Sequence, residues 1–223
     1  MMKGVWIHCY QEENPYILFL HGWGLNASYL KELEKETQSF ANSVLIDLPG
    51  FGENSPLDKA YDMEDYLFFI KNILEENHIK ISMIVGHSFG GKVAMYYASR
   101  ITPVCLLLLA PSIVKKRKSW KEKLRQVFLK KHQASRDYLQ AKGYLRSTLV
   151  RMVHRYPVFE MKRYNQRVIL FGGLEDEEVI ISQLKEAHTY LKNSELWLEK
   201  GNHFAYQRYV KEIAKKIKKE LCL

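Results

Sequence analysis

Residues 86–90 read Gly-His-Ser-Phe-Gly, a G-x-S-x-G pattern that can present a serine as a nucleophile. An apolar run at 81–85 precedes the pattern, and a helical segment at 92–100 follows it. A sharp turn between them would hold Ser88 in a strained conformation with its hydroxyl exposed, and a side chain at either glycine would collide with neighbouring backbone. The helix then directs its N-terminal amides towards the charge that develops when a serine attacks a carbonyl. The pattern therefore predicts nucleophilic catalysis at Ser88.

A serine hydroxyl becomes a strong nucleophile only when a base takes its proton, which requires a histidine elsewhere in the chain. His203 follows a strand predicted at 195–198, just as Ser88 follows its own strand. In an open parallel sheet these strand ends share one edge, where active sites form. An unperturbed imidazole titrates near pH 6.5, so we expect His203 to accept the proton and return it to the leaving group.

A carboxylate is the third group that such a site needs, because it holds the imidazole in the productive tautomer and stabilises its cation. Four acidic residues stand together at 175–178, shortly after a strand predicted at 167–171. Asp176 and Glu175 are the candidates among them, and most of this run is expected to be a solvated loop ahead of a helix. The nucleophile, base and acid lie far apart in the sequence, so the topology of the sheet would have to bring them together.

Five short motifs in a fixed order give the chain a resemblance to a known family. They are His21-Gly-Trp-Gly after an early strand, Asp47-Leu-Pro-Gly-Phe-Gly-Glu-Asn-Ser after the next, the G-x-S-x-G of Ser88, Gly173-x-x-Asp176 and Gly201-x-His203. Over nearly its whole length the sequence resembles the α/β-hydrolase family of serine hydrolases. The resemblance implies a triad of Ser88, His203 and Asp176, with Asp176 favoured over Glu175 as the acid.

The same resemblance implies an oxyanion hole made by the backbone N–H groups of Trp23 and Phe89. Phe89 directly follows the nucleophile, and Trp23 lies on the glycine-rich loop after an early strand. The indole of Trp23 is expected either to line the acyl pocket and bind substrate or to pack in the core. His21 would shape the oxyanion loop, and His87 would point elsewhere on the turn without a chemical role.

Two loops, at 21–27 and 47–52, are similar to those of the pimeloyl-acyl-carrier-protein methyl ester esterases of biotin synthesis. This likeness implies a serine esterase, and the most specific substrate that it implies is a carrier-bound methyl ester. Neighbouring esterases, lyases and cofactor-free haloperoxidases share much of the pattern. Two alternatives therefore stay open: a thioesterase or a lyase of the menaquinone-pathway type, and a non-catalytic protein that keeps the ligand pocket.

Strands and helices alternate along the chain, which predicts a parallel sheet covered on both faces. We expect an α/β fold with a mostly parallel, twisted sheet of about seven strands and a small helical lid, as the α/β-hydrolase resemblance implies. The predicted strands are 5–9, 16–20, 43–47, 81–85, 104–109, 167–171 and 195–198, and the predicted helices are 28–40, 62–77, 91–100, 179–191 and 204–221.

Residues 113–165 differ from the rest of the chain in charge. They contain 16 Lys or Arg and three acids, a net charge of +13, whereas the whole chain of 223 residues carries +9. We expect this segment to be a basic helical lid on a core formed by 1–112 and 166–223. Two apolar faces at helical spacing would cover Ser88; their residues are Trp120, Leu124, Val127 and Phe128, and then Leu145, Leu149, Met152 and Val153.

The outer side of this lid is expected to be basic, with Arg146, Arg151 and Arg155 in one stripe. Such a face would steer an acidic partner that carries the substrate, namely an acyl carrier protein or coenzyme A. Attraction to anionic lipid and an ordinary solvated helix face are the alternatives. We expect no nucleic-acid partner, because no recognition motif accompanies the charge.

Other features of the sequence argue against several classes of protein. Cys9, Cys105 and Cys222 show neither metal-ligand spacing nor a disulfide framework. No metal, flavin or nucleotide motif is present, so no cofactor is expected. No apolar run approaches the roughly 18 residues that span a membrane, and 1–9 lack the apolar stretch of a signal peptide, which together favour the cytoplasm.

Overall fold

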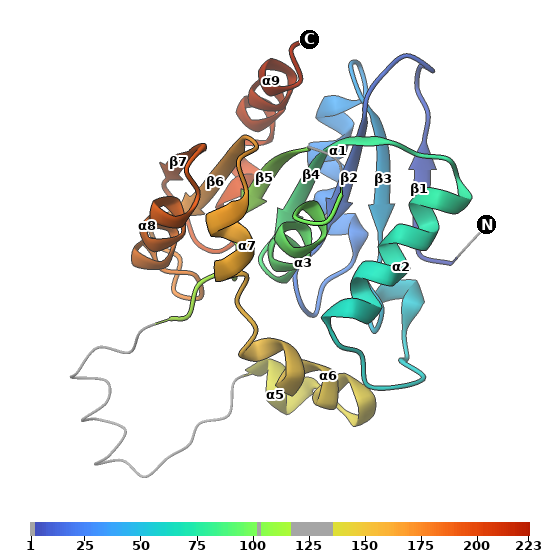
Figure 1. Cartoon of the computed structure of the whole chain (residues 1–223), viewed down its shortest axis with the longest axis vertical. Helices are drawn as coiled ribbons and strands as arrows, with labels where there is room; N and C mark the ends of the chain where they lie inside the picture. Colours follow the sequence, from blue (N-terminus) through green and yellow to red (C-terminus); the bar gives the residue numbers. More distant parts are fainter. Residues whose placement is uncertain (1–2, 102–103, 117–135) are drawn as a thin grey trace.

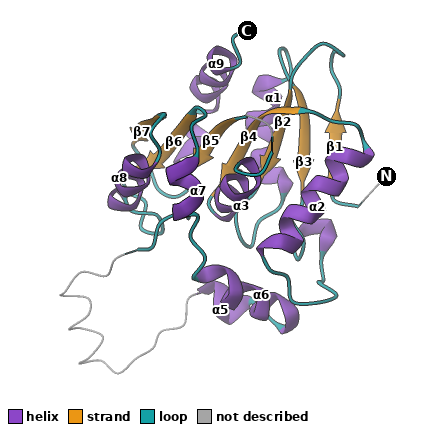
Figure 2. Ribbon diagram, in the orientation of Figure 1, coloured by secondary structure: helices purple, strands orange, loops and turns teal. Residues whose placement is uncertain are grey.

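The computed structural model describes residues 3–101, 104–116 and 136–223, which form three layers with one twisted sheet in the middle (Figures 1 and 2). The sheet has seven strands in the order β1-β3-β2-β4-β5-β6-β7. Neighbouring strands are parallel except at one edge, where β1 runs antiparallel to β3. The predicted mostly parallel α/β sheet is confirmed.

The strands are mostly short apolar runs, and those in the middle of the sheet are buried on both faces because helices cover both sides. β1 and β7, at the two edges, are only partly buried. The strands are β1 (Val5–His8), β2 (Tyr16–Leu20), β3 (Asn42–Ile46), β4 (Ile81–His87), β5 (Cys105–Leu109), β6 (Val168–Gly173) and β7 (Ser194–Glu199).

The sheet divides the core into two apolar clusters, each closed by its own helices. On one face, α1 (Lys31–Thr37) packs against α9 (Val210–Glu220), whose buried Ile213 and Ile217 lie one helical turn apart. The other face is covered by α2 (Met63–Glu76), α3 (Phe89–Ala98) and α8 (Ile181–Tyr190).

Two helices begin later than the sequence pattern suggests. The segment predicted at 28–40 is a 3₁₀ turn at Ala27–Leu30 followed by α1, and the segment predicted at 204–221 is a 3₁₀ turn at Ala205–Arg208 followed by α9. At the first turn, the backbone N–H of Ala27 donates to the Asp47 carboxylate at 2.7 Å, which ties the chain to the loop after β3. Tertiary contacts of this kind override local helix propensity.

Three short helices lie in the described part of 113–165: α5 (Arg136–Gln140), α6 (Gly143–Val153) and α7 (Val158–Arg163). Figure 1 shows α5 and α6 beyond the carboxyl ends of the central strands. Leu149 and Met152 are buried, but Val153 is 43% exposed, so its predicted place on an inner face is wrong. Val153 is the last residue of α6, where the helix leaves the core. The other predicted face, Trp120, Leu124, Val127 and Phe128, lies outside the described residues.

Candidate active site

Ser88 occupies a tight turn between β4 and α3, with φ 51° and ψ −109°. Positive φ is strained for a serine and persists only where the surroundings enforce it. Three backbone hydrogen bonds do so here: Ser88 N donates to Leu109 O at 2.9 Å, and Ser88 O accepts from Lys92 N at 3.2 Å and from Ser112 N at 3.1 Å. The strained turn predicted at this position is confirmed.

Glycines allow three segments to meet at this turn. A Cβ at Gly86 would lie 2.7 Å from Gly90 O, and a Cβ at Gly90 would overlap the Leu20 carbonyl at the end of β2. A Cβ at Gly22 would lie 3.3 Å from the Cβ of Ser88. The loop after β2 therefore lies directly against the serine.

His203 and Asp176 form a buried pair in which the imidazole Nδ1–H donates to Asp176 Oδ2 at 2.8 Å. The second carboxylate oxygen of Asp176 accepts the backbone N–H groups of Glu178 at 2.8 Å and Val179 at 2.9 Å. These bonds fix the carboxylate and place the proton of His203 on Nδ1, so that Nε2 is the free base. The side chain of Glu175, the alternative acid, is exposed, and the structure pairs Asp176 with the histidine.

The loops that carry this acid and this histidine are joined by their backbones. Leu174 N donates to Glu199 O at 2.8 Å, and Glu175 N donates to Gly201 O at 2.9 Å. Both loops follow neighbouring parallel strands, β6 and β7. The pair is therefore set by sheet topology, as the sequence predicted.

His87, the residue before the serine, contacts the histidine loop. Its Nε2–H donates to the backbone oxygen of His203 at 3.1 Å, and the two imidazole rings lie 4.8 Å apart. The ring is 1% exposed, and burial together with the nearby His203 lowers the pKa of His87 to about 3. Its Nδ1 is buried and has no hydrogen-bond partner among the described residues. The expectation that His87 points elsewhere is wrong, because the histidine loop returns against this part of the turn.

The Nε2 atom of His203 lies 3.5 Å from the carboxylate of Glu178, whose side chain is 70% exposed. Among the described residues, no hydrogen bond joins His203 to the hydroxyl of Ser88. Catalytic hydrogen bonds are often long or poorly aligned without substrate and shorten in the substrate complex.

The loop after β2 is held by His21, which is completely buried. His21 Nδ1–H donates to Gly22 O at 2.7 Å, and Nε2 accepts from Leu48 N at 2.8 Å. Burial lowers the pKa of His21 to about 4, so the ring is neutral near pH 7. Its two bonds join the loop after β2 to the loop after β3.

Trp23 is half-buried and packs its indole edge-to-face on two phenylalanines. The ring centroids lie 4.9 Å from Phe51 and 5.2 Å from Phe89. These contacts hold the Trp23 segment beside the first residue of α3, which directly follows Ser88. The backbone amides predicted for the oxyanion hole therefore come from two segments in contact.

The three arginines of the predicted basic stripe are all exposed, but they do not lie on one helix. Arg146 and Arg151 belong to α6, whereas Arg155 follows the end of that helix. The Arg151 guanidinium donates to Ala60 O at 2.7 Å, and Arg146 Nε donates to Ala141 O at 2.8 Å. The prediction that the three arginines form one stripe on a single helix is therefore wrong, because α6 ends before Arg155.

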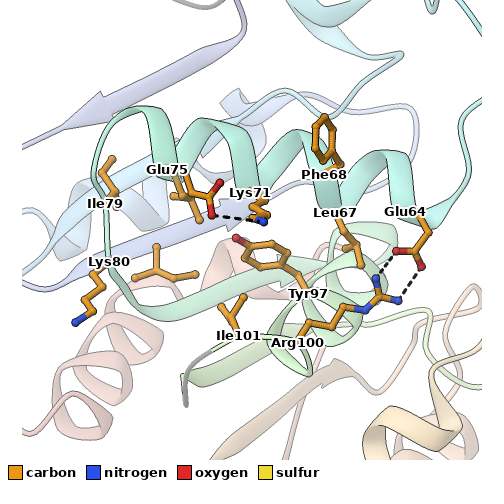
Figure 3. A pocket seen from close by; sticks show the side chains of 12 residues that line it. Glu64, Leu67, Phe68, Lys71, Glu75, Ile79, Lys80, Tyr97, Arg100 and Ile101 are labelled. Carbon is orange, nitrogen blue, oxygen red and sulfur yellow. Dashed lines mark hydrogen bonds and ion pairs between the residues drawn. The ribbon is translucent and has the colours of Figure 1, made fainter.

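A groove of about 540 Å³ lies between α2 and α3, at the other end of β4 (Figure 3). Arg100 forms an ion pair with Glu64 across it, and Lys71 lies 3.6 Å from Glu75. The groove reaches the first residue of β4, whereas Ser88 follows the last, and a seven-residue strand is roughly 20 Å long. The groove is therefore separate from the candidate site.

Within the described ranges, no cluster of three or more His, Cys, Asp or Glu side chains is arranged to hold a metal ion. In the same parts of the chain, no helix has both the length and the apolar composition needed to cross a membrane.

The sequence matches known proteins along most of its length. Residues 17–215 match the sequence profile of the Alpha/beta hydrolase family. The pimeloyl-[acyl-carrier protein] methyl ester esterase of Pseudoalteromonas atlantica is 35% identical over 106 residues, which are 45% of this chain and 40% of that protein. The enzyme of the same name from Salmonella heidelberg is 26% identical over 110 residues, 49% of this chain and 43% of its own. The chain thus matches less than half the length of these relatives.

Solved structures resemble the fold as a whole. The bromoperoxidase from Bacillus anthracis has a TM-score of 0.79 at 16% identity and covers 98% of this chain and 95% of its own. The esterase from Exiguobacterium antarcticum has a TM-score of 0.75 at 13% identity, with coverages of 99% and 96%. At these identities the likeness shows a common fold.

Proposed function

The chain belongs to the α/β-hydrolase family, and we propose that it is a serine hydrolase that cleaves a carboxylic ester through an acyl-enzyme intermediate. The observation that carries the proposal is the buried hydrogen bond of 2.8 Å between His203 and Asp176. The loop of His203 is tied to the residue before Ser88 by the bond from His87, and Ser88 itself is held at φ 51°. This pair leaves Nε2 of His203 to act as the base for Ser88.

In the first half of the reaction, Ser88 Oγ attacks the ester carbonyl carbon while its proton passes to Nε2 of His203. Asp176 stabilises the imidazolium that results. The tetrahedral intermediate collapses when the bond to the alcohol oxygen breaks, and His203 gives its proton to that oxygen. In the second half, a water molecule attacks the acyl carbon while His203 Nε2 takes its proton. The second tetrahedral intermediate collapses when the bond to Ser88 Oγ breaks, His203 returns the proton to that oxygen, and the carboxylic acid leaves.

The negative oxygen of each tetrahedral intermediate needs donors aimed at it. We assign this role to the backbone N–H groups of Trp23 and Phe89, the second of which lies at the N-terminus of α3. The ring contacts between these two residues support the assignment, because they keep the two amides in a fixed relation.

A fluorophosphonate probe tests the nucleophile. We expect the probe to label Ser88, and Ser88→Ala to abolish both labelling and turnover of a short-chain p-nitrophenyl ester. Ser112→Ala is the matched control, because Ser112 bonds to the turn through its backbone only among the described hydrogen bonds. Undiminished turnover in Ser88→Ala would exclude the proposed mechanism.

For the natural substrate, we propose an acyl methyl ester presented by an acidic carrier, either acyl carrier protein or coenzyme A. The named activity of the two curated relatives supports this. So does the net charge of +13 over residues 113–165, which we propose form a lid on a core of 1–112 and 166–223. All three arginines, Arg146, Arg151 and Arg155, are exposed, and α6, which carries the first two, lies beyond the carboxyl ends of the central strands (Figure 1).

Charge reversal tests the carrier. We expect Arg146→Glu, Arg151→Glu and Arg155→Glu combined to raise the apparent KM for a carrier-bound ester about tenfold, because surface charge steers the encounter. Hydrolysis of a small free ester should change by less than about twofold, since it needs no docking.

The control carries the same change of charge elsewhere. Lys211, Lys215 and Lys219 are exposed on α9, which lies at the far end of the molecule from α6 (Figure 1). Reversing these three should leave the KM for the carrier-bound ester unchanged. An equal rise of KM in both triple variants, or an equal loss of activity on both substrates, would contradict the docking proposal.

A panel of methyl esters, thioesters and elimination substrates decides the class of reaction.

A further inference from the structure

Lys92 is a buried cation that the proposed mechanism does not use. It lies on α3, four residues after Ser88, and is 2% exposed. Burial lowers its pKa from 10.5 to about 8, and within the described ranges no carboxylate forms an ion pair with it. A buried, unpaired ammonium is unfavourable unless other groups satisfy it, so its contacts need an explanation.

The ammonium of Lys92 binds the C-terminal turn of α6. Its Nζ donates to Met152 O at 3.1 Å and lies 4.9 Å from the ring centroid of Tyr156. The carbonyl end of a helix and the face of an aromatic ring both attract a cation. The contact therefore joins the helix that follows the nucleophile to a helix of the segment 113–165.

The backbone of Lys92 is bonded to the nucleophile itself. Its N–H donates to the carbonyl oxygen of Ser88 at 3.2 Å and closes the first turn of α3. One residue thus links the strained turn to α6, with its main chain on Ser88 and its side chain on Met152.

Two other polar contacts of α6 reach a different part of the fold. Thr148 Oγ1 accepts from Tyr61 N at 2.8 Å, and Arg151 donates to Ala60 O at 2.7 Å. Both partners lie in the segment before α2. Among the residues that the structure describes, Lys92 supplies the hydrogen bond between α6 and α3.

Apolar side chains of both helices pack on the same face of the sheet, and one of them directly follows Ser88. Met152 of α6 and Phe89 of α3 belong to one buried cluster, against which Leu145 and Trp23 also pack. The ring of Phe89 continues to Tyr66 at 5.3 Å. An acyl chain attached to Ser88 would extend towards this apolar surface, so its fit depends on how α6 sits relative to α3.

We propose that Lys92 is a positioning residue that holds α6 against the nucleophile helix and thereby sets the selectivity for longer acyl chains. The role in acyl-chain selectivity rests on the proposed ester hydrolysis. The role in holding α6 against α3 rests only on the contacts of Lys92 with Met152 and Tyr156.

Three purified variants test the proposal. Lys92→Met keeps the apolar length of the side chain and removes the donor. We expect it to fold, because Met152 O also accepts the backbone N–H groups of His154 and Arg155 and is not left unpaired. Lys92→Arg keeps a donor, and Lys142→Met is the control, since Lys142 is exposed at the start of α6.

The first readout is amide hydrogen exchange. In Lys92→Met we expect the amides of α6 to exchange about tenfold faster, the effect of losing one charge-assisted hydrogen bond, while those of β6 keep the wild-type rate. Lys92→Arg should restore much of the protection, and Lys142→Met should match the wild type. Unchanged exchange of α6 in Lys92→Met would overturn the proposal.

The second readout compares p-nitrophenyl octanoate with p-nitrophenyl acetate. For Lys92→Met we expect kcat/KM on octanoate to fall about tenfold, mainly through KM, with the acetate value within about twofold of the wild type. Equal losses on both esters, or no loss on octanoate, would reject the role in selectivity. A wild-type protein that is neither labelled at Ser88 nor active on any ester would defeat the proposed function instead, and exchange would still decide whether Lys92 holds α6.

Discussion

A methyl group at position 90 has no room, because it would overlap the Leu20 carbonyl and lie 2.5 Å from His21 O. We expect Gly90→Ala to lower the free energy of unfolding by about 1–3 kcal/mol, measured by urea denaturation. Turnover should fall as well, since relief of the overlap must move the end of β2 and the loop that follows it.

Gly143→Ala provides the comparison for this loss. Gly143 has φ 52°. Outside its own helix and chain neighbours, no atom of the described residues lies within 4 Å of the place that a Cβ would take, so only backbone strain of about 1 kcal/mol is expected. A loss of stability in Gly90→Ala no greater than that in Gly143→Ala would contradict the close-approach argument.

The buried ring of His87 gives a second prediction for a single residue. His87→Phe keeps an aromatic ring but removes the Nε2–H that donates to His203 O. We expect kcat to fall about five- to tenfold, because the loop that carries the base loses one of its anchors. His87→Gln keeps an N–H donor and should retain more activity. Equal rates for the two variants in a stopped ester assay would argue against this anchor.

Single residues differed in how well the sequence predicted them. Ser88, Asp176 and His203 stand in motifs whose spacing relative to strand ends is readable, and the Asp176–His203 contact lies where that spacing puts it. His87 occupies the variable position of its motif, so nothing local marks it. Its contact is with a residue 116 positions away, and only the folded sheet creates it.

At the scale of elements, Lys92 couples α3 to α6 and makes stability depend on pH. Native Lys92 loses its proton near pH 8, whereas the unfolded lysine keeps its proton up to about 10.5. Between these values the unfolded chain binds more protons, so this group makes the native state more stable as pH rises. Lys92→Met lacks the effect. Its free energy of unfolding relative to wild type should therefore decline from pH 8 to pH 10.

Urea denaturation at pH 7, 8, 9 and 10 measures this difference. Lys142→Met should show a constant difference from wild type across the series, since its side chain is exposed. A constant difference for Lys92→Met as well would show that folding does not lower the pKa of Lys92.

The elements were predicted well where they form the sheet and less well elsewhere. Most described strands are largely apolar segments of four to seven residues, whereas β7 also carries Glu195 and Glu199. Their short length is what favours strands over buried helices. The 3₁₀ turn at Ala27–Leu30 was missed because the bond from Ala27 to Asp47 is a tertiary contact. For α6, helical spacing identified Leu149 and Met152 as buried but could not show where the core ends, and Val153 lies past that point.

At the scale of the whole molecule, two buried histidines should make the protein sensitive to acid. Burial lowers the pKa of His21 to about 4 and of His87 to about 3, whereas unfolded histidines titrate near 6.5. Below pH 6.5, His21 and His87 therefore bind protons in the unfolded chain but not in the native state. We expect the free energy of unfolding to fall steadily from pH 6.5 to pH 4.

Variants identify the groups responsible for this loss. His87→Phe should show a smaller fall over the same interval, because one of the two histidines is gone. His154→Gln, which changes an exposed histidine, should behave like the wild type. If all three proteins lost stability in parallel between pH 6.5 and pH 4, buried histidines would not be the cause.

The carboxylate of Asp47 stands where two loops cross. Its oxygens accept Ala27 N at 2.7 Å and Glu53 N at 2.8 Å, and Gly52 leaves space for it. The loops after β2 and β3 are therefore not independent modules. If residues 21–27 alone were moved to another scaffold, the loop would lack the Asp47 carboxylate that accepts Ala27 N. A redesign of this entrance must therefore move both loops together with Asp47.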